Sequence, residues 1–237
     1  MQIIITENYE ALSRLASDEL IKQIKEKPNS IIYLPTGNTP LGMYEILSKK
    51  ENAGLISFKE TIFFNLDEYV GMMPNNPSSF YYYMQKNFYL KLKVKPKNYI
   101  FENLNNPAES CRNYENILKK YGPADMVVLG IGQNGHICFN EPGSSREGRC
   151  KVISLTKETQ RINNSPIQAM TMGIANILES RKIIQLISGE SKKEIAAKVI
   201  EGEISPNYPA SYLHEHSNVK IILDKEAASL LKQNYEK

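Results

Sequence analysis

The feature that most constrains the fold of this chain is an alternation of short apolar runs with longer amphipathic stretches. Each run is rich in Ile, Val, Leu or Phe, as is typical of strands buried in a sheet. The runs are Gln2–Ile5, Ser30–Leu34, Thr61–Asn65, Asp125–Leu129, Lys182–Ile187 and Val219–Leu223. They predict a sheet whose strands are separated along the chain by helices.

The stretches between the runs carry apolar residues near helical spacing. Thr6 is placed to cap a first helix over about residues 7–26. Further helices are expected at about 40–49, 79–90, 108–120, 167–178, 191–201 and 225–232. Strands that alternate with helices predict an α/β fold, a doubly wound, mostly parallel sheet with helices on both faces (Rossmann-like).

No repeat, low-complexity segment or Pro/Gly/Ser linker divides the sequence, so residues 1–237 are expected to form a single domain. Hydrophobic residues make up 41% of the chain and charged residues 23%. This composition is typical of a globular domain and argues against extensive disorder.

The charge and apolar patterns exclude several classes of partner. The net charge is only +3 and no block of five like charges occurs, so no nucleic-acid partner is expected. No apolar run approaches the roughly 18 residues of a membrane span, and the first residues are too few for a signal-peptide core. Three cysteines, Cys111, Cys138 and Cys150, form no CxxC pair. They favour a reducing compartment, so we expect a cytoplasmic protein without membrane contact.

Polar segments, three of which contain glycine, follow four of the predicted strands. Parallel sheets bind ligands at the carboxyl ends of their strands, so these four segments are the places to search for a site. They read PTGNTP, LDEY, GIGQNGHICFNEPG and SGESK.

The first of these segments has the features of a phosphate-binding turn. Gly37 allows close backbone approach, a helix begins directly afterwards, and the hydroxyls of Thr36 and Thr39 flank Gly37 and Asn38. A simple turn with a threonine cap explains the same residues, and the segment is neither a Walker loop nor a dinucleotide fingerprint. In SGESK and the lysine that follows it, Lys192 or Lys193 is able to reach a phosphate, or else the segment is the solvated start of a helix.

Two further segments carry titratable side chains suited to proton transfer. Asp67 and Glu68 directly follow a predicted strand. A carboxylate at this position serves as a general base if it is partly desolvated, because desolvation raises its pKa. If it is solvated, it is only part of an acidic turn or a helix cap. His136 lies in a glycine-rich loop with Asn134 and Glu141 nearby. These polar neighbours favour a role for His136 in acid–base chemistry over a purely structural role.

His214 and His216 alternate as on a strand, so they are expected to point to one face. Two such histidines are able to hold a metal, but no third ligand is evident nearby, and packing or surface polarity is the preferred interpretation. We therefore expect no metal at this pair of histidines. The run Phe80–Tyr83 is assigned to a helix that is partly buried.

Together these segments resemble the glucosamine-6-phosphate deaminase family, within the group that includes 6-phosphogluconolactonases. The matching stretches occur in the family's order over most of the chain. They are LPTGNTPLGMYEIL, FFNLDEYVGM, NPSSFYYYMQKNF, LGIGQNGHICFNEPGSS, AMTMGIANIL and LISGESK.

The resemblance implies that an amino-sugar 6-phosphate is isomerised and loses ammonia, giving a ketohexose 6-phosphate without any cofactor. Asp67 matches the base that moves a proton between C2 and C1, and His136 matches the group that assists ring opening. Glu141 and Asn134 match its partners, with Asn134 standing where the best-known members carry Asp. The resemblance places the phosphate on Thr36–Thr39 and Lys192.

The chain departs most from the family after Leu155–Arg161. An Arg-Phe-Phe segment that carries a phosphate-binding arginine in glucosamine-specific members is missing, and Ile162–Pro166 is expected to run directly into the next helix. Arg161 is a weak candidate to replace that arginine. The shortened form resembles relatives assigned to galactosamine 6-phosphate, so either epimer is kept as the substrate, with a slight preference for galactosamine.

The chain ends soon after the last predicted helix, whereas the large hexameric members of the family have a longer C-terminal tail and an allosteric amino-sugar site. We therefore expect no such allosteric site, and we expect a monomer or small homo-oligomer. Two other functions remain open from the sequence, a 6-phosphogluconolactonase-type hydrolase and a catalytically inactive sugar-phosphate-binding module.

Overall fold

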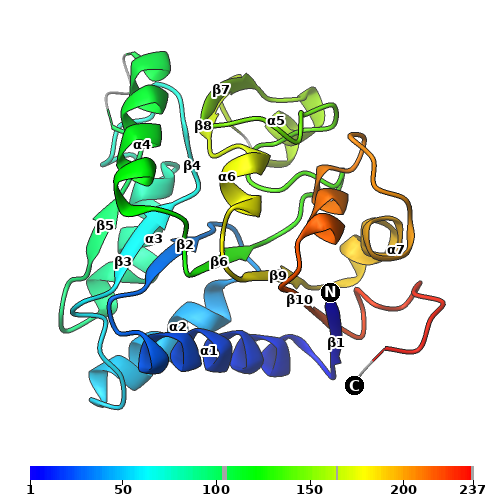
Figure 1. The fold of residues 1–237 in the computed structure, drawn as a ribbon, viewed down its shortest axis with the longest axis horizontal. Coiled ribbons are helices and arrows are strands. Elements are labelled where there is room, and N and C mark those ends of the chain that lie inside the picture. Colours follow the sequence, from blue (N-terminus) through cyan, green and yellow to red (C-terminus); the bar gives the residue numbers. More distant parts are fainter. Residues whose placement is uncertain (103–105, 164, 236–237) are drawn as a thin grey trace.

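The computed structural model describes residues 1–102, 106–163 and 165–235. Its centre is a seven-stranded sheet in which every paired strand is parallel (Figure 1). The strand order is β1 (Gln2–Thr6), β10 (Val219–Asp224), β9 (Ile183–Ile187), β6 (Met126–Leu129), β2 (Ile31–Leu34), β3 (Ile62–Asn65) and β5 (Lys97–Tyr99). The predicted α/β fold and the six predicted strands are confirmed, whereas β5 was not predicted.

Helices cover both faces of this sheet because successive strand residues point to opposite sides. Ile32 and Leu34 of β2 pack with α1 (Tyr9–Glu26), α2 (Leu41–Asn52) and α3 (Phe80–Asn87). Tyr33 belongs to the core of the other face, which includes residues of α4 (Pro107–Tyr121), α6 (Ile174–Leu178) and α7 (Lys193–Glu201). Figure 1 shows α1 and α2 on one side and α4 and α6 on the other.

The predicted helices at 7–26, 40–49, 108–120 and 191–201 correspond to α1, α2, α4 and α7. The helix expected over 79–90 is divided, because α3 ends at Asn87 and a 3-10 turn, η1, follows at Tyr89–Lys91. The cap predicted for α1 was wrong. Asn8 caps the helix by accepting a hydrogen bond from the Ala11 amide at 3.0 Å, while Thr6 is the last residue of β1.

A second, three-stranded antiparallel sheet lies beyond the carboxyl ends of the main strands. Its order is β4 (Asp67–Tyr69), β8 (Gln168–Thr171) and β7 (Lys151–Ser154). The helix predicted over 167–178 was therefore wrong in its first half, where β8 pairs with two neighbours and only α6 is helical. A short helix, α5 (Lys157–Asn163), precedes β8, so the shortened segment leads into a strand.

The helix predicted over 225–232 was also wrong. Residues 225–230 form turns, in which the Asp224 carboxylate accepts a hydrogen bond from the Ala227 amide at 2.9 Å. Two 3-10 segments complete the described elements, η2 at Glu190–Lys192 and η3 at Pro209–Glu215. Within the described ranges, no helix combines the length and the apolar character needed to cross a bilayer.

Candidate active site

A cavity of about 580 Å³ opens where β2, β3, β6 and β9 end. The segments that follow all four strands contribute to its lining, as the position of ligand sites in parallel sheets predicts. Its polar or titratable lining side chains are Thr36, Asn38, Thr39, Asp67, Tyr69, Ser78, Tyr83, Gln133, Asn134, His136, Cys138, Thr159, Ser191 and Lys192.

The segment Thr36–Thr39 connects β2 to α2 and forms one wall of the cavity. Gly37 has a φ of +93°, so the left-handed conformation falls on the glycine and not on Asn38. The hydroxyl of Tyr83 donates a hydrogen bond to the Gly37 carbonyl, and that of Ser188 lies 3.3 Å from Oγ1 of Thr39. Side chains from outside the turn therefore hold it in shape.

Lys192 is the only cationic side chain among the described residues that line the cavity. Its ammonium donates a hydrogen bond to the carbonyl of Ile131 at 2.8 Å, and burial lowers its pKa. Lys193 is instead paired with Glu190 at 2.8 Å and does not line the cavity. Of the two lysines, it is therefore Lys192 that offers a positive charge to the cavity.

Asp67 lies on β4, directly beyond the end of β3, and only 7% of its surface is exposed. Burial, followed by the negative charge of neighbouring Glu68, raises its pKa well above the ordinary value of 3.8. A raised pKa suits a general base, because the proton-transfer efficiency of a carboxylate grows as its pKa approaches the working pH.

His136 faces a carboxylate that is firmly held in the same loop. Its Nδ1 atom lies 3.5 Å from Oε2 of Glu141, and the amide of Asn134 donates to the same oxygen at 2.7 Å. A Cβ on Gly132 would lie 2.3 Å from the imidazole Cε1, so only glycine allows the ring this position. Burial alone would raise the pKa of Glu141, but the polar side chains around its carboxylate, His136 and Thr159 foremost, lower that pKa to about 2.

A family model described as "Glucosamine-6-phosphate isomerases/6-phosphogluconolactonase" matches residues 6–222 of the chain. The chain belongs to this family, and it is an enzyme. Glucosamine-6-phosphate deaminase of Thermoanaerobacter sp. (strain X514) is 43% identical over 98% of this chain and 95% of that protein. Glucosamine-6-phosphate deaminase 1 of Bacillus subtilis (strain 168) is 40% identical over 97% and 99%.

Solved structures agree with this assignment. A monomeric glucosamine-6-phosphate deaminase superposes with a TM-score of 0.92 at 40% identity, covering 97% of this chain and 100% of that one. The 6-phosphogluconolactonase of Trypanosoma cruzi superposes with a TM-score of 0.82 at 20% identity, covering 98% and 97%. At that identity the lactonase shows the fold alone.

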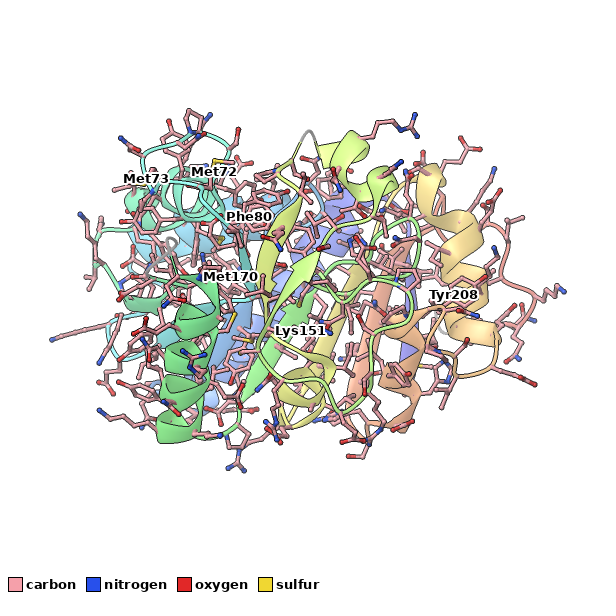
Figure 2. The ribbon with its side chains drawn as sticks, turned by 90° about the horizontal axis from the view of Figure 1, so that it is seen from above. Met72, Met73, Phe80, Lys151, Met170 and Tyr208 are labelled. Atoms are coloured by element: carbon pink, nitrogen blue, oxygen red, sulfur yellow. The ribbon has the colours of Figure 1, made fainter. Side chains whose placement is uncertain are left out.

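Several residues that line the cavity were not singled out from the sequence. Thr159 reaches the cavity from α5, which sequence reasoning did not predict. Tyr69, Phe80 and Phe139 form an apolar wall, with ring centroids 4.6 to 5.6 Å apart. Figure 2 shows Phe80 close to Met72, which packs against the same cluster. Cys138 lines the cavity with a φ of +52°, although nothing in its sequence context indicates a left-handed residue.

Arg161 and the two C-terminal histidines lie outside this cavity. Arg161 is exposed on α5 and is not among the described lining residues. His214 and His216 each place Nε2 within hydrogen-bond distance of a carbonyl oxygen, Val199 at 2.7 Å and Ser180 at 2.6 Å. His214 lies in η3 and not on a strand, and within the described ranges no group of three metal-ligating side chains forms.

Proposed function

We propose that this enzyme converts a hexosamine 6-phosphate and water into a ketohexose 6-phosphate and ammonia. The observation that carries the proposal is the meeting of Asp67, His136 and the Thr36–Thr39 turn in one cavity, although 100 residues separate Thr36 from His136 in the sequence. The names of the relatives that match nearly the whole chain support the same reaction.

The phosphate is expected to bind between the Thr36–Thr39 turn and Lys192. The turn precedes α2, whose N-cap residue Pro40 supplies no side-chain hydrogen bond, so the positive end of the helix dipole favours an anion there, although the Gly42 amide already donates to the Tyr9 hydroxyl at 2.9 Å. Lys192 adds a charge-assisted hydrogen bond. With the phosphate fixed at this end, C1 and C2 of the sugar extend toward Asp67 and His136.

His136 is expected to open the sugar ring by moving a proton from the C1 hydroxyl to the ring oxygen. The C1–O5 bond breaks and C1 becomes an aldehyde. Glu141 orients the imidazole and stabilises its protonated form during the transfer. Asn134 holds Glu141 in place, and as an amide it takes up no net proton.

Asp67 is expected to carry out the isomerisation that follows. Its carboxylate removes the proton from C2 while the protonated amine on C2 passes one of its protons to the C1 oxygen, which gives an enolamine. The carboxylic acid then returns a proton to C1, and the nitrogen on C2 becomes an iminium. Water adds to C2 and ammonia leaves, so the ketose carbonyl forms at C2 and the base is regenerated.

The names of the relatives support glucosamine 6-phosphate as the substrate. The shortened segment before β8 had given a slight preference for galactosamine 6-phosphate. The two sugars differ only at C4, so the same catalytic groups serve either one. A monomer or small oligomer in the cytoplasm, with no nucleic-acid partner, remains the expectation for the assembly.

The experiment is a coupled assay of ammonia release from glucosamine 6-phosphate and galactosamine 6-phosphate. We expect release from at least one epimer, with the ratio of kcat/KM values giving the preference. Ammonia from neither sugar would overturn the proposal. Hydrolysis of 6-phosphogluconolactone in its place would identify a lactonase, and binding without turnover would identify an inactive module.

A further inference from the structure

Glu68 is a buried carboxylate to which the proposed mechanism gives no role. Only 4% of its surface is exposed. Its Oε1 accepts hydrogen bonds from the amides of Tyr69 at 2.8 Å and Phe80 at 3.0 Å, and its Oε2 accepts one from the Tyr81 amide at 2.9 Å. The side chain of one β4 residue thus binds the first amides of α3, where the helix dipole favours a negative charge.

Helix α3 runs from the amides that Glu68 binds to the side of the cavity formed by the Thr36–Thr39 turn. The hydroxyl of Tyr83, one turn along α3, donates a hydrogen bond to the carbonyl of Gly37. The rings of Phe80 and Tyr83 line the cavity between the two ends of this connection. Glu68 therefore ties the strand that carries Asp67 to the helix that supports the Thr36–Thr39 turn.

We propose that Glu68 is a positioning residue, which sets Asp67 at a fixed place relative to the phosphate-binding turn by anchoring β4 to the N-terminus of α3. The inference rests on the proposed function, because the distance that matters is the one between C2 and the phosphate of a single substrate. A misplacement of about 1 Å costs on the order of 100-fold in rate.

The charge of Glu68 adds a second effect that a purely structural anchor would not have. In the part of the chain that the structure describes, the groups that interact electrostatically with Asp67 are Glu68, the thiol of Cys138 and the hydroxyl of Tyr114. Among the described residues, neither Asp67 nor Glu68 has an ion-pair partner within 4.0 Å. The carboxylate of Glu68 therefore contributes, after burial, to the raised pKa of Asp67.

The test uses Glu68→Gln, which keeps the size of the side chain but removes its charge and one acceptor oxygen. The matched control is Ser79→Ala, which removes the α3 cap, a 3.0 Å hydrogen bond from the Tyr82 amide, without touching Glu68. Both variants are assayed for kcat and KM from pH 5 to 9. Hydrogen exchange of the Phe80 and Tyr81 amides is measured in the same proteins without substrate.

For Glu68→Gln we expect kcat to fall between about 10-fold and 100-fold with KM changed less. The acid limb of kcat moves to lower pH because a negative charge beside Asp67 is gone, and the Phe80 and Tyr81 amides exchange faster. Ser79→Ala leaves the acid limb in place. A folded Glu68→Gln protein with unchanged kcat, acid limb and exchange would overturn the proposal.

The two measurements keep this inference separate from the proposed function. If the wild-type enzyme releases no ammonia but Glu68→Gln loses amide protection, the proposed reaction fails and the anchoring contact stands. If the wild-type enzyme is active and Glu68→Gln keeps both its rate and its protection, the reaction stands and the positioning role fails.

Discussion

Oε2 of Glu141 lies 3.5 Å from Nδ1 of His136, within the same glycine-rich loop. The pKa of Glu141 is about 2, so this carboxylate stays ionised at every pH at which the enzyme is expected to work. The imidazole therefore always faces a negative charge on one side and the cavity on the other. This arrangement fixes which nitrogen meets the substrate.

Glu141→Gln removes that charge while keeping the size of the side chain. We expect kcat to fall by about 100-fold, near the lower end of what a positioned acid–base group contributes, since His136 remains but is less well oriented. The measurement is ammonia release at saturating substrate. Glu147→Gln is the control, because Glu147 is an exposed residue of a nearby loop that pairs with Arg146 at 2.7 Å. A Glu141→Gln rate within threefold of the wild type would contradict the assigned role.

The same variant has a stability signature with a definite sign. A carboxyl whose folded pKa is lowered stabilises the fold above its unfolded pKa, and this contribution disappears as the pH falls through the folded pKa. For Glu141 the window runs from about 4.5 down to about 2. The melting temperature of Glu141→Gln is expected to lie below that of the wild type at pH 7, and the difference to shrink within this window.

Asp67→Asn tests the base. We expect loss of ammonia release and of solvent deuterium incorporation at C1 of the ketose, because an amide accepts no proton, while the affinity for the sugar phosphate is retained. Asp18→Asn, on the exposed face of α1, is the control. Turnover in Asp67→Asn comparable to the wild type would exclude Asp67 as the base.

The raised pKa of Asp67 also predicts that this carboxylate, although it is needed for activity, lowers the stability of the fold at pH 8. Its folded pKa is raised, so its contribution to stability is present below 3.8 and is lost as the pH rises through the raised value. Asp67→Asn is therefore expected to melt at a higher temperature than the wild type at pH 8, with the difference shrinking toward pH 3.8. Calorimetry across this range would contradict the argument if the two proteins melted together throughout.

The strands of the main sheet were predictable because their signal is local. Runs such as Ile31–Leu34 and Ile183–Ile187 are buried on both faces, so each is largely apolar, and Gln185 is the one amide within the second run. The second sheet was not predictable in this way. Residues 168–171 read QAMT and precede a true helix, and they form a strand only because β4 and β7, both distant in sequence, pair with them. Here tertiary contacts override local propensity.

The candidate site likewise contains residues that the sequence predicted and residues that it did not. Asp67, His136 and the Thr36–Thr39 turn follow predicted strands, and the rule about strand ends was enough to bring them together. Glu68 was seen only as a second carboxylate beside Asp67, because its three donors come from its own neighbour and from a helix that begins 12 residues later. Thr159 reaches the cavity from a helix with no apolar periodicity to reveal it.

Arg161→Ala tests whether the shortened segment before β8 still supplies an arginine to the phosphate. Arg161 is exposed and lies outside the cavity lining, so we expect KM to change less than about threefold, as for an ordinary surface charge. Steady-state kinetics with both sugar epimers is the measurement. An increase of tenfold or more would show that α5 brings Arg161 to the bound phosphate.

Lys192→Met tests the one lysine or arginine in the described lining of the cavity, with Lys193→Met as the neighbouring control. A hydrogen bond to a charged group contributes about 1.5–3 kcal/mol, so KM is expected to rise about 10-fold to 100-fold in Lys192→Met and to stay near the wild-type value in Lys193→Met. Inorganic phosphate should inhibit the wild type and lose potency in the same variant.

The pH dependence separates a phosphate ligand from a structural lysine at this position. Burial lowers the pKa of Lys192 below its ordinary value of 10.5, so the wild-type KM is expected to be flat near neutral pH and to rise once the ammonium loses its proton. In Lys192→Met that alkaline rise disappears, because no titrating cation is left in the described lining of the cavity. A Lys192→Met enzyme that keeps the alkaline rise, or binds the sugar phosphate as tightly as the wild type, would place the phosphate elsewhere.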